Sequence, residues 1–260
     1  MNLSKKTVVI TGASSGIGRA TALEMARRGA NVVLAARRVE RLEEVAAECR
    51  ALGVTALSVT TDVTKPEDCR RLIDAVGSVD VLVNNAGFAL FAAVAEANAD
   101  GLREMMETNY FGTVHCTQAV LPQMLARREG TIVNVASIAG LMGYARMGGY
   151  CATKFALVGF TEALRDEVIG SGVKVALVCP GTTDTDFFVK AEKGKMPGAS
   201  RLMPAVTAER VARAVCDAAE DGRYRRILPV LAAIYMRMKE VFPRFAHALF
   251  RRTSALMERR

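Results

Sequence analysis

The segment Thr11-Gly12-Ala13-Ser14-Ser15-Gly16-Ile17-Gly18 lies between a run of β-branched residues, 7–10, and a segment of helical periodicity, 17–28. Its first glycine permits a tight turn, the second lets the backbone approach a pyrophosphate, and the third lets the helix pack closely against the strand. The start of the helix also presents unpaired N–H groups and the positive end of its dipole to phosphate groups. This strand–turn–helix unit predicts a dinucleotide-binding site in a doubly wound α/β fold.

The alternation of strands and helices continues along the chain. Further strands are expected at residues 31–35, 55–60, 79–83, 131–135, 173–178 and 226–228, and further helices at 39–52, 66–76, 100–126, 150–170 and 207–220. Strands that alternate with helices form parallel βαβ units, and nearly continuous apolar strands fit a sheet that is covered on both faces. The 260-residue chain is expected to form a single doubly wound Rossmann-type α/β domain with a parallel sheet of about seven strands. This domain would span residues 1–228, followed by a basic amphipathic extension, 229–260.

The composition argues against several classes of protein, among them metalloenzymes, secreted proteins and membrane-spanning proteins. Six scattered cysteines with no C-x-x-C pair indicate reduced thiols, and two distant histidines, His115 and His247, argue against a metal site or a serine–histidine hydrolase. The first strand begins too near Met1 to leave room for a signal peptide. The longest apolar run near the C-terminus, 228–236, is shorter than the ~20 residues that span a bilayer. We expect a cytoplasmic protein with no metal ion.

Three further motifs follow predicted strands: Asp62-Val63-Thr64, Asn84-Asn85-Ala86-Gly87 and Pro180-Gly181-x-x-x-Thr185. With the T-G-x-x-x-G-x-G spacing of the glycine turn, they resemble the short-chain dehydrogenase/reductase family over about residues 4–228. The resemblance implies a nicotinamide cofactor, with Asp62 at the adenine and the segment after Pro180 beside the nicotinamide amide. The residues that it places at the cofactor are Gly12, Ser14, Ser15, Gly16, Ile17, Gly18, Asp62, Val63, Asn85, Ala86, Gly87, Tyr150, Lys154, Pro180, Gly181, Thr183 and Thr185.

The end of the second predicted strand bears on which nicotinamide cofactor binds. Its sequence is Leu34-Ala35-Ala36-Arg37-Arg38, with no acidic residue to receive the ribose 2′-hydroxyl of NAD. Arginine pairs with the 2′-phosphate of NADP, and Arg37 stands where NADP-preferring members of the family carry a basic residue. NADP(H) is the predicted cofactor, with Arg37 and Arg38 near the 2′-phosphate. The alternative is that both arginines are a solvated helix start.

Tyr150 and Lys154 are four residues apart and share one face of a predicted helix. A tyrosine has a reference pKa near 10, and a neighbouring ammonium together with the positive nicotinamide would lower it toward neutral pH. Ser137, at the end of a predicted strand, would hydrogen-bond the substrate oxygen and polarise a carbonyl. In the family, Asn109 completes a tetrad by holding a water that relays protons to the lysine. The predicted reaction is hydride transfer between the nicotinamide and a carbonyl carbon, with Tyr150 donating or taking the proton.

The C-terminal extension departs from the family pattern. Residues 223–260 carry ten basic and two acidic side chains, which accounts for the whole net charge of +8. Apolar residues recur among them at helical spacing, at Leu231, Ile234, Met238, Val241 and Phe242. This pattern is typical of a helix that lies on anionic lipid, or of one that packs on its own domain or on a partner subunit. Nucleic acid is not expected as a partner, because the charge interleaves with an apolar stripe.

The predicted substrate is apolar. Met142, Tyr144 and Met147 lie between the serine and the tyrosine, and the segment 186–204, where the family places its lid, contains several apolar residues. We expect a small-molecule ketone or alcohol of lipid-like character, such as a long-chain keto lipid, steroid or retinoid. The alternatives are a 3-oxoacyl thioester or small-carbonyl reductase, and a non-catalytic NADPH-binding interaction protein. The family resemblance also implies a homodimer, through the helices that contain Asn109 and Tyr150.

Overall fold

The computed structural model of the chain describes residues 1–183, 205–245 and 248. Its strands are β1 (Thr7–Thr11), β2 (Asn31–Ala36), β3 (Ala56–Thr60), β4 (Val81–Asn84), β5 (Gly130–Val135), β6 (Val173–Pro180) and β7 (Arg225–Leu228). Its α-helices are α1 (Gly16–Arg27), α2 (Val39–Ala51), α3 (Pro66–Val76), α4 (Ala99–Met106), α5 (Gly112–Arg127), α6 (Gly148–Glu167), α7 (Ala208–Asp221) and α8 (Val230–Val241). The predicted strands and helices are confirmed, with boundaries that differ by a few residues.

The seven strands form one parallel sheet in the order β3-β2-β1-β4-β5-β6-β7. The strand order reverses between β1 and β4, which pair in register from Val8 with Val81 to Ile10 with Val83. In open α/β sheets the crevice beside such a reversal, at the carboxyl ends of the strands, is where ligands bind. The predicted doubly wound Rossmann-type fold is therefore confirmed, and its topology locates the candidate site.

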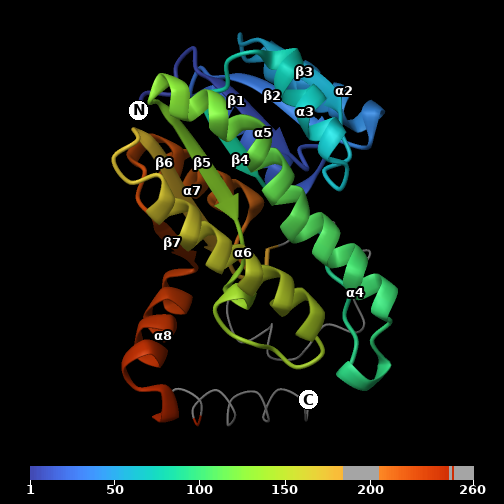
Figure 1. Cartoon of the computed structure of the whole chain (residues 1–260), viewed down its shortest axis with the longest axis vertical. Helices are drawn as coiled ribbons and strands as arrows, with labels where there is room; N and C mark the ends of the chain where they lie inside the picture. Colours follow the sequence, from blue (N-terminus) through green and yellow to red (C-terminus); the bar gives the residue numbers. More distant parts are fainter. Residues whose placement is uncertain (184–204, 246–247, 249–260) are drawn as a thin grey trace.

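Two apolar layers cover the sheet. On one face α1, α2 and α7 pack over alternate strand residues such as Val8 and Ile10. On the other face α3, α5 and α6 pack over the intervening residues, such as Val9. Figure 1 shows these helices flanking the sheet, whose strands point toward the part of the molecule where α4 and α8 lie. Because both faces are covered, the strands read as continuous apolar runs in the sequence.

One feature differs from the sequence-based expectation. The helix expected over 100–126 is α4 and α5 joined by a π-helical segment, Glu107–Phe111, which contains Asn109. Such π-helical turns inside α-helices are frequent at functional sites. In addition, α8 begins two residues after β7 ends. The boundary at residue 228 between a domain and an extension stays a prediction.

Candidate active site

The residues predicted to form the site come from six loops at one edge of the sheet. They follow β1, β2, β3, β4, β5 and β6. Because all strands are parallel, the carboxyl ends of these strands meet at the same edge. The structure therefore brings together the glycine turn, the Asn84–Gly87 segment, Ser137 and the Pro180–Thr183 segment, and α6 adds Tyr150 and Lys154. Thr185 and the expected lid segment, 186–204, lie outside the described residues.

The turn after β1 has the backbone geometry that its glycines allow. Gly12 and Gly16 have positive φ angles of +65° and +53°, a region that other residues rarely adopt. A Cβ atom on Gly18 would lie 2.6 Å from Nδ2 of Asn85 and would collide with the carbonyl oxygen of Gly12. The start of α1 is therefore pressed against the turn, which leaves a backbone-lined cradle suited to a pyrophosphate.

Arg38 folds back over this cradle. Its guanidinium donates to Oγ of Ser14 at 2.9 Å and to Oγ of Ser15 at 2.7 Å. Arg37 is exposed, and it makes no hydrogen bond or ion pair with the residues that the structure describes. The two neighbouring arginines thus differ: Arg38 holds the turn, whereas the Arg37 guanidinium is available to a ligand.

The Asn84–Gly87 segment connects the turn to the chemical end of the site. The Asn85 side-chain amide donates to the carbonyl oxygen of Thr11 at 3.0 Å, and the backbone N–H groups of Asn85 and Ala86 donate to Thr11 Oγ1. A Cβ atom on Gly87 would lie 2.9 Å from Oδ1 of Asn109 and 3.8 Å from Nζ of Lys154. Asn85 therefore supports the turn through its amide, and its predicted contact with the cofactor stays a prediction.

Asp62 and Val63 lie at the edge beyond β3. Asp62 Oδ1 accepts hydrogen bonds from the backbone N–H and the hydroxyl of Thr64, at 3.1 and 2.8 Å. The carbonyl oxygen of Val63 lies 3.0 Å from a ring nitrogen of His115, and its side chain packs against Gly112. These contacts fix the loop in which the sequence predicts an adenine contact. His115 is a packing residue in this structure.

Asn109 is fully buried and bonded to protein groups on both sides of its amide. Its Oδ1 accepts from the N–H of Phe88 at 2.9 Å, and its Nδ2 donates to the Phe88 carbonyl and to Oγ1 of Thr153 at 3.0 Å. Thr153 in turn donates to the backbone carbonyl of Tyr150 at 2.8 Å. Asn109 therefore ties the loop after β4 to the helix that carries Tyr150 and Lys154, and its predicted water relay stays a prediction.

Ser137 lies between β5 and β6. Its hydroxyl accepts from the N–H of Ala139 at 3.1 Å and donates to the carbonyl of Pro180 at 3.4 Å. Beyond Pro180, the N–H of Gly181 donates to Leu228 at 2.7 Å, and Thr183 donates from its hydroxyl to the Gly181 carbonyl at 3.1 Å. The segment predicted to contact the nicotinamide is thus anchored to β7 and to Ser137.

Tyr150 and Lys154 form a buried pair, with the lysine Nζ 5.8 Å from the centre of the tyrosine ring. Burial raises the pKa of Tyr150 well above its ordinary value, and a hydrogen bond with Ser137 acts in the opposite direction. Burial also lowers the pKa of Lys154 to about 8. The sequence predicts a lowered tyrosine pKa, but that prediction includes the positive nicotinamide. In the protein alone, desolvation is the larger effect on both groups.

The lowered pKa of Lys154 predicts a pH-dependent stability difference between the protein and its Lys154→Met variant. Between pH 8 and the unfolded-state value of 10.5 the unfolded chain holds more protons on this lysine than the folded chain, so the wild type gains stability as pH rises. Below pH 8 the cost of burying the charge is fully present. We expect the difference in unfolding free energy to change by on the order of 3 kcal/mol across this window. Urea unfolding at several pH values measures it, and parallel pH profiles would contradict it.

An apolar cluster surrounds Tyr150. Its buried members are Phe88, Ala89, Phe91, Met105, Ile138, Ala139, Met142, Tyr144, Met147, Tyr150, Cys151, Ala232 and Met236. Of these residues, Met142, Tyr144 and Met147 were predicted from the sequence, whereas the phenylalanines and the α8 residues were not. Phe88 directly follows the Asn84–Gly87 segment, and this position in the sequence indicates that it lies near the site. The sequence pattern alone does not indicate that Ala232 and Met236 of α8 pack in this cluster.

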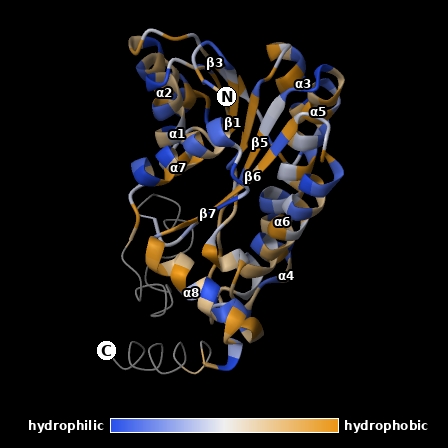
Figure 2. Cartoon of the chain, turned by 90° about the vertical axis from the view of Figure 1, so that its left-hand side faces the viewer, coloured by the Kyte–Doolittle hydropathy of each residue, from blue (hydrophilic) through white to orange (hydrophobic). Residues whose placement is uncertain are grey.

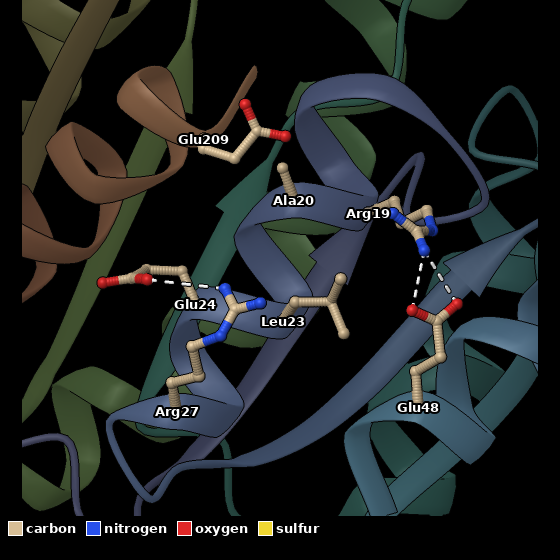
Figure 3. A pocket seen from close by; sticks show the side chains of 7 residues that line it. All are labelled: Arg19, Ala20, Leu23, Glu24, Arg27, Glu48 and Glu209. Carbon is tan, nitrogen blue, oxygen red and sulfur yellow. Dashed lines mark hydrogen bonds and ion pairs between the residues drawn. The ribbon is translucent and has the colours of Figure 1, made fainter. Parts of the chain in front are cut away.

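A separate surface hollow lies between α1, α2 and α7 (Figure 3). It is lined by Arg19, Ala20, Leu23, Glu24, Arg27, Glu48 and Glu209. Arg19 pairs with Glu48 at 2.6 Å, and Arg27 with Glu24 at 3.8 Å. Four of its five charged side chains are thus paired within the protein, and it contains none of the predicted site residues.

Known proteins similar to this chain identify its family. The family model for short chain dehydrogenases matches residues 6–195. The chain therefore belongs to the short-chain dehydrogenase/reductase family of oxidoreductases.

Three similar proteins place the chain within that family. Human 17-beta-hydroxysteroid dehydrogenase 13 (Homo sapiens) is 34% identical over 96% of this chain and 84% of that protein. The NADP-dependent 3-hydroxy acid dehydrogenase of Schizosaccharomyces pombe is 41% identical over 72% of this chain and 75% of its own. A short-chain dehydrogenase/reductase of Burkholderia phymatum, crystallised with NAD, superimposes with a TM-score of 0.84 at 29% identity, covering 92% of this chain and 94% of that one.

Over residues 1–183 and 205–245, no helix is both long enough and apolar enough to cross a bilayer. In the same residues, no three His, Cys, Asp or Glu side chains gather in a way that could hold a metal ion.

Proposed function

We propose that the protein is an NADP(H)-dependent oxidoreductase that transfers a hydride between the nicotinamide and a ketone or secondary alcohol. The observation that carries this proposal is the buried cluster of Ser137, Tyr150 and Lys154. It lies at the carboxyl edge of the sheet, the same edge at which the glycine turn follows β1. The cofactor, when bound, supplies or accepts the hydride. Tyr150 donates or takes the proton at its phenol oxygen, and Ser137 hydrogen-bonds the substrate oxygen. The Lys154 ammonium would favour the phenolate form of Tyr150. Asn109 holds the helix of Tyr150 in place through Thr153.

The cofactor preference rests on the segment after β2, where Arg37 is exposed and Arg38 holds the glycine turn. The turn fits a dinucleotide because Gly12 and Gly18 let the start of α1 and the Asn85–Ala86 segment pack directly against it, where a Cβ atom would collide. The exposed Arg37 has the charge and geometry to bind a 2′-phosphate. The relative from Schizosaccharomyces pombe is NADP-dependent by name, whereas the Burkholderia phymatum protein was crystallised with NAD. No acidic residue stands in the segment 34–38, where β2 ends, and this favours NADP(H).

The substrate class rests on the apolar cluster around Tyr150. Phe88, Phe91, Met142 and Met147 offer adaptable apolar surface to a large substrate. The human relative, a hydroxysteroid dehydrogenase by name, supports a lipid-like ketone or alcohol. The yeast relative, a 3-hydroxy acid dehydrogenase, favours the second candidate, a small-carbonyl or 3-oxoacyl thioester reductase.

A panel of ketones separates these two candidates. NADPH consumption is followed with short 3-oxoacyl thioesters, small carbonyls, long-chain keto lipids and steroids, each with wild-type protein and with a Tyr150→Phe control. We expect kcat/KM to rise with apolar size, by about tenfold for each 1.4 kcal/mol of apolar burial gained in the transition state. Tyrosine-dependent turnover confined to the small polar carbonyls would establish the second candidate instead.

The expected homodimer has a surface that could form it. Leu102 on α4, Leu125 on α5 and Phe155 on α6 are exposed, as is Phe111 between α4 and α5. These helices contain or adjoin Asn109 and Tyr150, whose side chains point inward. The exposed apolar side chains favour self-association through this side of the molecule.

A further inference from the structure

The helix α8 carries apolar side chains on two opposite faces. One face packs on the domain: Ala232 and Met236 are buried in the cluster around Tyr150, and Lys239 donates to the carbonyl of Leu141 at 2.7 Å. On the other face, Ile234 is 60% exposed and Val241 is 66% exposed. Figure 2 shows the hydrophobic residues of α8 at the end of the molecule below β7.

Helix geometry separates these two faces. At 3.6 residues per turn, Ile234 lies about 160° around the axis from both Ala232 and Met236. The exposed stripe also includes Val230 and Leu231, and it continues past the helix with Phe242 and Phe245, each more than half exposed. A helix face that only meets water is polar. The packing of α8 on its domain therefore accounts for one apolar face and leaves the other exposed among the residues that the structure describes.

The charges beside this stripe indicate its partner. Arg237 and Arg244 are exposed next to it, and residues 223–260 carry ten basic against two acidic side chains. The rest of the chain is neutral, since its 25 basic and 25 acidic residues cancel. Two copies that met through this surface would bring two segments of charge +8 together, which is unfavourable. An anionic lipid surface complements both the charge and the apolar stripe.

We propose that the exposed apolar face of α8, with Arg237 and Arg244 beside it, is a docking surface for an anionic membrane. The proposal does not depend on the identity of the substrate. Docking would hold the apolar cluster around Tyr150 next to the bilayer, because the opposite face of the same helix is part of that cluster. The residues involved in docking and those involved in chemistry are separate, so each function can be tested alone.

Co-sedimentation with vesicles tests this docking. The full chain is mixed with vesicles of phosphatidylcholine alone or of equimolar phosphatidylcholine and phosphatidylserine. We expect binding to the anionic vesicles that weakens as salt is added. An Ile234→Asn variant should bind about tenfold more weakly, because it loses the transfer of one apolar side chain into the interface. The matched control is Ile169→Asn, since Ile169 is 76% exposed at the end of α6, away from α8.

A charge variant provides a second, independent measurement. Arg237→Gln should weaken anionic binding by about fivefold, whereas Arg70→Gln on α3 should leave it unchanged. Thermal unfolding confirms that each variant is folded, as expected for changes at exposed positions. The proposal is overturned if the wild type binds neither vesicle, or if Ile234→Asn and Ile169→Asn lose binding equally. It is also overturned if Ile234→Asn dissociates an oligomer, because the surface would then join copies of the chain.

Discussion

Replacing Tyr150 with phenylalanine is expected to lower kcat by about 10² to 10⁴-fold, the range over which general acid–base catalysis contributes, with little change in NADPH affinity. The change removes only the phenol oxygen. The ring stays packed in its apolar cluster, and the glycine cradle and Arg37 are untouched. Initial rates at saturating ketone measure the first effect, and a fluorescence titration with NADPH measures the second.

Tyr224→Phe is the control for this variant. The Tyr224 hydroxyl donates to Glu162 at 3.0 Å, outside the apolar cluster of Tyr150, so its loss should leave kcat near the wild-type value. If Tyr150→Phe retained full turnover, another group would supply the proton and the proposed mechanism would be wrong. If Tyr150→Phe lost turnover but kept full biological activity, the third interpretation, an NADPH-binding interaction protein, would be favoured.

The parts of the structure that could be predicted are those in which one local pattern decides the outcome. Continuous apolar strands alternating with helices require a covered parallel sheet. In such a sheet, residues that end different strands must meet at one edge. This is why Gly12, Asn85 and Ser137, far apart in the sequence, could be assigned to one site before their positions were known.

The parts that the sequence did not predict depend on tertiary contacts. Arg37 and Arg38 look equivalent in the sequence, but only Arg38 is held by the Ser14 and Ser15 hydroxyls. The π-helical turn at Asn109 has no distinct local signature. For α8, periodicity indicates an apolar stripe, but it does not say which side chains of that stripe meet the domain. These outcomes are decided by neighbours that come from other segments of the chain.

Because Arg38 is held by the turn and Arg37 is available to a ligand, replacing Arg37 is expected to have the second large effect, on NADPH binding. Arg37→Asp should weaken NADPH binding by about 100-fold and change NADH binding little. The variant removes charge-assisted hydrogen bonds to the 2′-phosphate and places a carboxylate near it, a loss of ~3 kcal/mol. NADH has a 2′-hydroxyl at that place, which an aspartate can accept from. Dissociation constants for both cofactors, measured by fluorescence titration, give the ratio directly.

Arg38→Asp is the comparison that makes this result specific. Arg38 binds the hydroxyls of Ser14 and Ser15 in the turn that both cofactors would use. Its replacement should therefore weaken NADPH and NADH binding together, because the cradle loses its support whichever cofactor enters it. An equal loss of both cofactors in Arg37→Asp would mean that Arg37 also supports the turn, and the NADP assignment would fail. A selective loss in Arg38→Asp, with none in Arg37→Asp, would move the 2′-phosphate contact to Arg38.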